Sequence, residues 1–168
     1  DAKGCMSSDT TTISAPPPVA MNIGMDTTLS GYGLLCYGDT LGAAYVSALG
    51  GNGGYSFLWS NGSISDSVSG LSAGTYNVMI TDAKGCNTID SVTITSPASI
   101  PVNAGVITNS YGFTNDCWNS ADGTAFVQLP LGLSAIWSNF MAGDTVANLT
   151  PGKQWVTLTD TLGCQSTD

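Results

Sequence analysis

Five cysteines are the residues of this sequence that are best suited to covalent chemistry: Cys5, Cys36, Cys86, Cys117 and Cys164. They stand far apart, form no C-x-x-C pair, and have no histidine that could join them on a zinc ion. The chemistry that they predict is therefore the formation of structural disulfides in an oxidising compartment. Buried free thiols are the alternative.

The other reactive residue types exclude the common catalytic sets. Histidine, glutamate and arginine are absent, all 12 acids are aspartates, and the 3 bases are lysines. Without histidine there is no Ser/His/Asp or Cys/His set, and there is no glutamate pair for glycoside hydrolysis. The glycines of "GGNGG" are typical of a turn, because no lysine follows them at P-loop spacing. We expect a protein that is not an enzyme and has no cofactor.

Calcium is the one metal that the composition leaves open. Hard oxygen ligands are plentiful in Asp39, Asp82, Asp116 and Asp122. Their spacing matches neither an EF-hand nor an RTX repeat, and scattered aspartates are more often turn residues. We therefore expect no metal site. A carbohydrate-binding accessory module, assisted by calcium, is kept as the alternative function.

The overall composition predicts an all-β chain without nucleic-acid or membrane partners. A net charge of −9 disfavours binding to nucleic acid and to anionic membrane surfaces. The apolar runs are too short to span a membrane. Residues that usually fill helix surfaces are scarce, and Thr, Ser, Gly, Asn and Val take their place. Hydrophobic residues make up 42%, which is enough to build a core.

An internal repeat organises the chain. The matching stretches keep their order: Cys36–Val46 with Cys117–Val127, Leu58–Gly62 with Ile136–Phe140, Leu71–Cys86 with Leu149–Cys164, and Gly85–Pro97 with Gly4–Pro16. We predict one complete module at 18–98, the last strand of a preceding module with a Pro-rich joint at 1–17, and a divergent module lacking its last strand at 99–168. Residues 1–9 align with 160–168, as expected for one repeating unit of a longer fibre.

Each module is predicted to be a β-sandwich of the immunoglobulin kind in an elongated tandem array. The stretches "GAAYVSALGG", "YSFLWSNG", "TYNVMITD" and "NTIDSVTIT" read as short strands separated by turns. Prolines 16–18, 97 and 101 mark stiff joints between the modules. Trp59 and Trp137 are expected in the core, as are Tyr76 and Trp155, which we take as equivalent positions. Tyr37 and Trp118 follow the first cysteine of each module and are expected to be exposed.

Two cysteine pairings are compatible with this repeat. The simpler one lies within modules, Cys36 with Cys86 and Cys117 with Cys164, and leaves Cys5 for the preceding module. However, a strand of seven residues, roughly 23 Å long, would separate the two cysteines of a module, and a disulfide needs Cβ atoms within about 4.5 Å. The rival pairing joins Cys36 to Cys164 of the next module. Cys5, Cys86 and Cys117 would then find partners in modules beyond this chain.

The quoted residues resemble the SprB-type repeat of cell-surface adhesins from gliding and other Bacteroidota. The family pattern is a Gly-Gly turn, a Trp-Ser-Asn-Gly strand end, Leu-x-x-Gly-x-Tyr and Asp-x-x-Gly-Cys. Residues 36–95 match it nearly throughout, whereas 117–164 match less well, with "LPLGLSA" in place of the Gly-Gly turn. The resemblance implies a structural and adhesive segment of a long extracellular surface filament, secreted by the type IX system, without catalysis. Its expected partners are neighbouring modules and identical chains, and a surface or glycan ligand that we leave unidentified.

The same source implies O-glycosylation. Bacteroidota modify Asp-(Ser/Thr) tripeptides that end in an apolar residue or threonine, and seven of the 12 aspartates stand in such a tripeptide. The alternative is that Asp-Thr and Asp-Ser are simply common turn pairs. Sugars would shield a Gly- and Ser-rich surface and cover exposed strand edges. The predicted acceptors are Thr10, Thr27, Thr40, Ser67, Ser91, Thr145 and Thr161.

Overall fold

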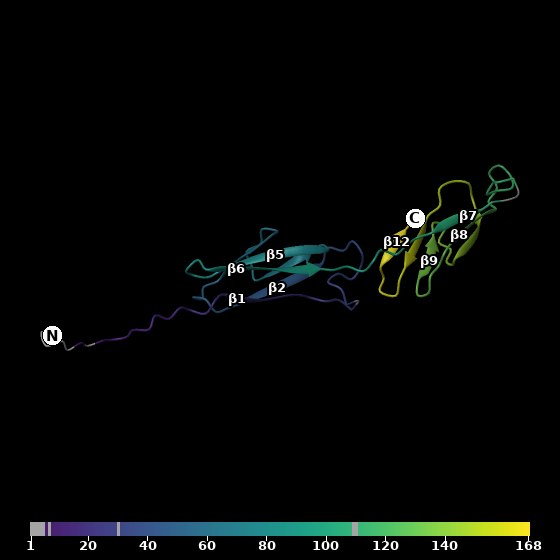
Figure 1. Cartoon of the computed structure of the whole chain (residues 1–168). Coiled ribbons are helices and arrows are strands. Elements are labelled where there is room, and N and C mark those ends of the chain that lie inside the picture. Colours follow the sequence, from purple (N-terminus) through teal and green to yellow (C-terminus); the bar gives the residue numbers. More distant parts are fainter. Residues whose placement is uncertain (1–5, 7, 30, 109–110) are drawn as a thin grey trace. The chain divides into compact units, whose positions relative to one another are not determined.

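The protein is all-β, as its composition predicts. The computed structural model describes residue 6 and residues 8–29, 31–108 and 111–168. These residues form twelve strands and no helix, and the strands are the arrows of Figure 1. The abundance of Thr, Val and Ser, which suit a pleated and half-buried surface, explains this outcome.

The first six strands form two three-stranded sheets, with the orders β1-β2-β4 and β3-β5-β6. Strands β1 and β2 pair antiparallel with Ile23 opposite Val46, and β3 and β5 pair antiparallel with Trp59 opposite Val78. The strands are β1 Ala20–Met25, β2 Gly42–Leu49, β3 Ser56–Trp59, β4 Ser67–Leu71, β5 Gly74–Thr81 and β6 Asn87–Ile94.

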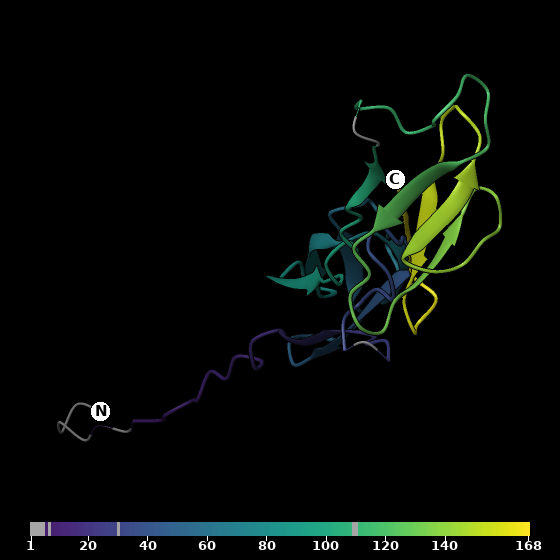
Figure 2. The same ribbon diagram turned by 90° about the vertical axis from the view of Figure 1, so that its right-hand side faces the viewer.

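The last six strands repeat this arrangement, with the sheet orders β7-β8-β10 and β9-β11-β12. They are coloured from green to yellow and are seen from the side in Figure 2. Each strand takes the place of the one six positions earlier, so the repeat of the sequence is also a repeat of topology. The strands are β7 Ala104–Ile107, β8 Gly123–Val127, β9 Ser134–Trp137, β10 Thr145–Leu149, β11 Val156–Thr159 and β12 Gln165–Thr167.

One hydrophobic cluster holds the second repeat together, and it draws residues from both of its sheets. Strands β8 and β10 supply four of them, and β9 and β11 supply the other four. These strands alternate between buried and exposed residues, as expected for strands with one face on a core. The cluster consists of Ala125, Val127, Ala135, Trp137, Val146, Leu149, Val156 and Leu158.

The first repeat buries side chains at the equivalent places. Trp59 is 2% exposed and Trp137 is 4% exposed, so both tryptophans are core residues as predicted. Each indole Nε1 donates to a backbone oxygen six residues on, that of Ser65 or of Gly143. A buried tryptophan needs such a partner for its one polar atom.

The prediction for Trp155 is wrong. Its side chain is 55% exposed. Aligning Val78 with Val156 makes Asn77 the true counterpart of Trp155, and Gln154 the counterpart of Tyr76. Because neighbouring residues of a strand point to opposite faces, an error of one position moves the side chain from the core to the surface.

By its internal contacts the chain divides into two compact units that do not follow the predicted repeat boundary at 98. Unit 1 contains 1–25, 43–69 and 75–93, and unit 2 contains 26–42, 70–74 and 94–168. The segment 26–42 precedes β2 in sequence but belongs to unit 2. There Leu34 is 1% exposed and its amide donates to the backbone oxygen of Thr95.

The expected extra strand at the start of the chain stays a prediction. Residues 1–5 and 7 lie outside the described residues, and the first strand of the structure begins at Ala20. In the second repeat, β12 takes the position of β6 with three residues in place of eight. It pairs with β11 in register, with Leu158 opposite Ser166.

The Pro-rich segment before β1 lies against the glycine turn that follows β2. The amide of Gly51 donates to the backbone oxygen of Pro17 over 2.8 Å. Gly50 has a φ of 74°, and a Cβ placed on it would lie 2.2 Å from the oxygen of Pro18. The turn therefore needs glycine at position 50 for its backbone conformation and for space.

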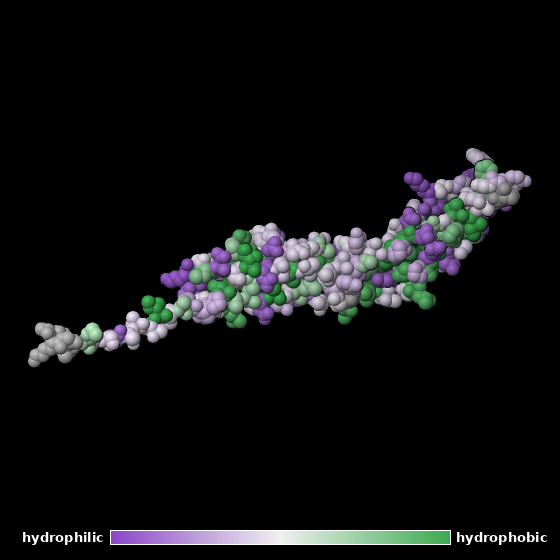
Figure 3. Space-filling model, viewed as in Figure 1, coloured by the Kyte–Doolittle hydropathy of each residue, from purple (hydrophilic) through white to green (hydrophobic). Residues whose placement is uncertain are grey.

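Exposed hydrophobic side chains are spread over the surface. Figure 3 shows separate green patches among larger pale and purple areas on the face that it displays. Trp118, Phe140 and Leu131 are almost fully exposed. Single exposed hydrophobic residues are normal on protein surfaces, so exposure alone does not mark a binding site.

Candidate functional site: the cysteine loops and turns

The cysteines lie in two kinds of structure, each of which occurs in both repeats. A loop before β2 or β8 carries Cys36 or Cys117, and we call residues 34–42 the Cys36 loop and 115–123 the Cys117 loop. A turn after β5 or β11 carries Cys86 or Cys164, and we call Asp82–Cys86 the Cys86 turn and Asp160–Cys164 the Cys164 turn.

A disulfide joins Cys36 to Cys164, with Cα atoms 5.4 Å apart. Cys164 is 7% exposed and Cys36 is half-buried. The bond therefore runs from the loop of the first repeat to the turn of the second, which is the rival pairing of the sequence analysis. The simpler pairing within a module is wrong for Cys36.

Cys86 and Cys117 are exposed free thiols in the structure. This arrangement excludes the pairing of Cys117 with Cys164 and of Cys36 with Cys86. Cys5 lies outside the described residues. The expectation that Cys5, Cys86 and Cys117 have partners in further modules stays a prediction.

Asp82 organises the Cys86 turn. It is 5% exposed, and its Oδ1 accepts hydrogen bonds from the amides of Lys84 and Cys86. Its Oδ2 accepts from the amide and the side-chain nitrogen of Asn52. The Asn52 side chain contributes most to lowering the pKa of Asp82 to about 2, and the three amides add to this while desolvation opposes it.

The Cys164 turn uses the same backbone pattern. The Oδ1 of Asp160 accepts from the amides of Leu162 and Cys164, over 2.8 and 2.9 Å. In each turn the aspartate amide donates to the cysteine oxygen, and the glycine amide donates to the aspartate oxygen. The two turns therefore hold their cysteines in the same local frame, one bonded and one free.

The Cys36 and Cys117 loops also share a hydrogen-bond pattern. The amide of Cys36 donates to Asp39 Oδ2 over 2.8 Å, and the amide of Asp39 donates back to the Cys36 oxygen. In the second repeat the amide of Cys117 donates to Ser120 Oγ over 3.3 Å, and the amide of Ser120 donates back to the Cys117 oxygen. Residues three places after each cysteine thus fix the loop.

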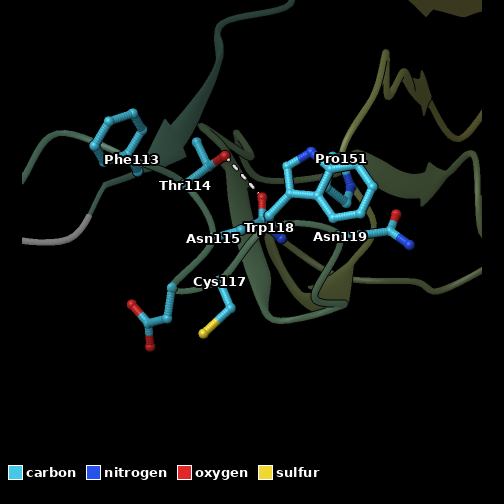
Figure 4. A pocket seen from close by; sticks show the side chains of 8 residues that line it. Phe113, Thr114, Asn115, Cys117, Trp118, Asn119 and Pro151 are labelled. Atoms are coloured by element: carbon cyan, nitrogen blue, oxygen red, sulfur yellow. Dashed lines mark hydrogen bonds between the residues drawn. The ribbon is translucent and has the colours of Figure 1, made fainter.

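An open pocket of about 470 Å³ lies along the Cys117 loop and Pro151. Figure 4 shows the ring of Phe113, which precedes this loop, and the indole of Trp118 on opposite sides of the view, with the sulfur of Cys117 directed away from both. Trp118 is 96% exposed, as predicted. Its counterpart Tyr37 is also exposed, at 66%.

The aspartates named as possible calcium ligands do not gather at one place. Asp39 and Asp82 accept hydrogen bonds in different turns. Asp122 accepts from the hydroxyl of Ser120 and the amide of Asp116, and these bonds, the Ser120 bond foremost, lower its pKa. Among the residues that the structure describes, no group of three or more acidic or cysteine side chains could hold a metal ion.

All seven predicted glycosylation acceptors are exposed. Six of them lie on loops, strand starts and turns, and Ser91 lies on an exposed position within β6, so an enzyme could reach each side chain from solvent. Whether they carry sugars stays a prediction. They are Thr10, Thr27, Thr40, Ser67, Ser91, Thr145 and Thr161.

No family model and no curated protein matches the chain. In the described part of the chain no helix is long and apolar enough to cross a membrane.

The two hydrogen bonds from Asn52 to the carboxylate of Asp82 were not predicted from the sequence. Its only signal was an asparagine within the glycine turn of the first repeat, where the second repeat has the divergent "LPLGL".

Proposed function

We propose that the chain is a structural and adhesive segment of a long secreted cell-surface fibre, built from immunoglobulin-like modules of the SprB type. The disulfide between Cys36 and Cys164 is the observation that carries this proposal. It connects the loop before β2 of one repeat to the turn after β11 of the next repeat, which suits a covalently braced array. The repeated strand order and the residues that resemble the SprB pattern support the same reading.

The bond gives such a fibre a mechanical role. Closing a loop with a sequence separation of 128 residues stabilises a folded chain by about 5 kcal/mol in the chain-entropy model. It also means that a force applied at the two ends passes through the disulfide and not through the strands between residues 36 and 164. The brace would resist extension even while a repeat unfolds.

Single-molecule pulling on the two chain ends tests this role. Because the residues between the bonded cysteines are bypassed, we expect a short extension in the oxidised protein. A thiol reductant should release up to roughly 450 Å more, since an extended residue spans about 3.5 Å. The double variant Cys36→Ser/Cys164→Ser is the matched control and should extend fully without reductant. Full extension of the oxidised wild-type chain, or unfolding without a measurable force, would contradict the mechanical role of the disulfide.

A carbohydrate-binding accessory module is the second candidate, because the exposed indole of Trp118 borders an open pocket. Aromatic rings at a surface can pack on sugar rings through their apolar faces. A glycan array probed with wild-type protein and with Trp118→Ala, each with and without calcium, separates the two candidates. Glycan binding that requires both Trp118 and calcium would favour the accessory module, because the fibre proposal includes adhesion but no calcium.

A further inference from the structure

The two exposed thiols occupy the two positions that are bonded elsewhere in the same chain. Cys117 is the counterpart of Cys36, and Cys86 is the counterpart of Cys164. Both bonded positions and both free positions have matching backbone hydrogen bonds in their loops and turns. The free thiols of Cys117 and Cys86 therefore lie in backbone conformations that match those of Cys36 and Cys164, which form a disulfide in the same chain.

The packing behind the loops is also equivalent. A Cβ on Gly42 would lie 2.8 Å from the oxygen of Leu71 and 3.2 Å from the Leu34 side chain. A Cβ on Gly123 would lie 2.9 Å from the oxygen of Leu149 and 3.2 Å from the Asn115 side chain. Each loop thus places the residue two before its cysteine against the same glycine of the following strand, so the two loops leave their strands in the same way.

We propose that Cys117 of one copy of this chain forms a disulfide with Cys86 of a second copy, so that the Cys117 loop is the docking surface for the Cys86 turn. This proposal deepens the fibre function and rests on it. The direction matches the bond already present, which joins the loop of one repeat to the turn of the repeat that follows. In a head-to-tail array the first repeat of the second copy follows the second repeat of the first copy.

The surroundings of the existing bond show what else the docked copies would bring together. A small pocket beside Cys36 and Cys164 is lined by Tyr37 and by Pro97 to Ile100. The counterpart of Tyr37 is Trp118, and the counterpart of Pro97 is Pro16. The exposed indole of Trp118 would accordingly pack on the proline segment of the second copy.

The second copy already holds that proline segment next to its Cys86 turn. Gly51 lies between the two. Its amide donates to the oxygen of Pro17, and a Cβ placed on it would lie 2.8 Å from Asp82 Oδ2. The prolines and the turn therefore form one surface within unit 1. The exposed aromatic residue of the Cys117 loop and this surface are complementary in kind, since an indole packs well on proline rings.

The bond forms by thiol–disulfide exchange with a low-molecular-weight disulfide such as oxidised glutathione. The thiolate of one cysteine attacks a glutathione sulfur and releases one reduced glutathione. The thiolate of the other cysteine then attacks the protein sulfur of the mixed disulfide and releases the second. Two protein thiols are oxidised, one glutathione disulfide is reduced, and each released thiolate takes up one of the two protons lost.

The test mixes two variants of the full chain, both made with Cys5→Ser so that this thiol cannot interfere. One carries Cys86→Ser and offers Cys117, and the other carries Cys117→Ser and offers Cys86. They are equilibrated in a buffer of oxidised and reduced glutathione, and the dimers are isolated without reductant. The three kinds of dimer are then distinguished by mapping their linked peptides, Cys117 to Cys86 in the heterodimer and Cys117 to Cys117 or Cys86 to Cys86 in the homodimers. We expect the heterodimer to be roughly ten times as abundant as the two homodimers taken together, which corresponds to a docking free energy of about 1.4 kcal/mol. Random pairing, with heterodimers at one half of all dimers, would overturn the proposal.

A third variant separates docking from mere thiol exposure. Trp118→Ala in the chain that offers Cys117 should reduce the heterodimer excess while leaving the Cys117 thiol accessible to a small alkylating reagent. An unchanged excess would overturn the docking surface. Peptide mapping must show that Cys36–Cys164 is intact in every sample. The pulling experiment depends on that internal bond alone, and the mixing experiment depends on Cys117 and Cys86. A failure of head-to-tail pairing and a failure of the mechanical role of the Cys36–Cys164 disulfide therefore give different results.

Discussion

At the scale of single residues, Asp82 shows how a turn that bears a cysteine is held in shape. Four hydrogen-bond donors converge on one carboxylate, and the turn between β5 and β6 has no other acceptor of that kind among the bonds described. The free thiol of Cys86 is thereby kept in place although it is exposed. In the Cys164 turn the disulfide adds a covalent restraint to the same frame.

The lowered pKa of Asp82 predicts a specific acid sensitivity. Since the pKa of Asp82 is about 2 in the folded protein and its ordinary value is 3.8, the contribution of Asp82 to stability is complete above a pH of about 4 and is lost as the pH falls towards 2. Urea unfolding of wild type and Asp82→Asn at several pH values measures this. We expect the difference in unfolding free energy between them to shrink over that window. A constant difference would contradict the assignment.

Trp59 is the core residue whose removal should cost most. Its side chain is almost completely buried and its Nε1 is bonded to Ser65. Trp59→Ala should lower the unfolding free energy by about 3–5 kcal/mol through the cavity that it leaves. Trp118→Ala, at an exposed position, is the matched control and should stay within about 0.5 kcal/mol of wild type. Denaturant melts of both variants decide, and a loss below about 1 kcal/mol for Trp59→Ala would contradict its role in the core.

At the scale of elements, the turn after β2 illustrates what the pattern of the sequence predicts and what it leaves out. The glycines predict a turn, and the structure has one at Gly50 to Gly53. The close approach of Pro18 to Gly50 could not be foreseen, because it joins segments that are distant in sequence. Position 50 therefore requires glycine both for its backbone conformation and because the Pro18 oxygen leaves no room for a side chain.

Gly50→Ala should therefore be more harmful than an alanine at a glycine that has only an unusual backbone. Gly62 is the control, since its φ is 86° and nothing lies within 4 Å of a Cβ placed there. Left-handed strain alone costs about 1–2 kcal/mol, and the collision with the Pro18 oxygen adds to it only at position 50. Thermal or urea unfolding of the two variants compares them. Equal losses would show that the proline segment moves away freely.

A glycine on an outer strand also has a partner that sequence patterns did not reveal. The ring of Tyr45 covers Gly24 of β1, and the ring of Phe126 covers Gly105 of β7. Cross-strand pairs of this kind contribute roughly 0.2–1 kcal/mol. The equivalent arrangement in both repeats explains why an aromatic residue stands at an exposed position of each strand.

At the scale of the whole molecule, much of the architecture was accessible from sequence because the repeat is strong. The positions of β2, β3, β5 and β6 and the burial of Trp59 and Trp137 follow from the strand patterns and from the alignment of the repeats, whereas β1 and β4 were not predicted. The disulfide was left open between two pairings, because spacing along the chain does not say which ends of the strands meet. That segment 26–42 belongs to unit 2 was not predicted either, because sequence spacing does not show which distant segments contact one another.

Mass mapping of the natively produced protein tests the surface prediction. We expect hexose-containing masses on peptides that carry the exposed Asp-Thr and Asp-Ser acceptors, with Thr40 and Ser67 as the first to examine. Asn-Thr pairs such as Asn87–Thr88 lack the aspartate and are the internal control. Bare acceptor peptides would contradict the glycosylation and weaken the resemblance on which it rests.

The bond between Cys36 and Cys164 has a consequence for how such a protein can change in length over evolutionary time. Each repeat contributes one loop cysteine and one turn cysteine, and the bond pairs the loop of one repeat with the turn of the next. Unequal recombination that inserts or deletes a whole repeat therefore leaves a matching cysteine for every neighbour. The number of repeats is then free to drift, whereas a break inside a repeat would strand a thiol.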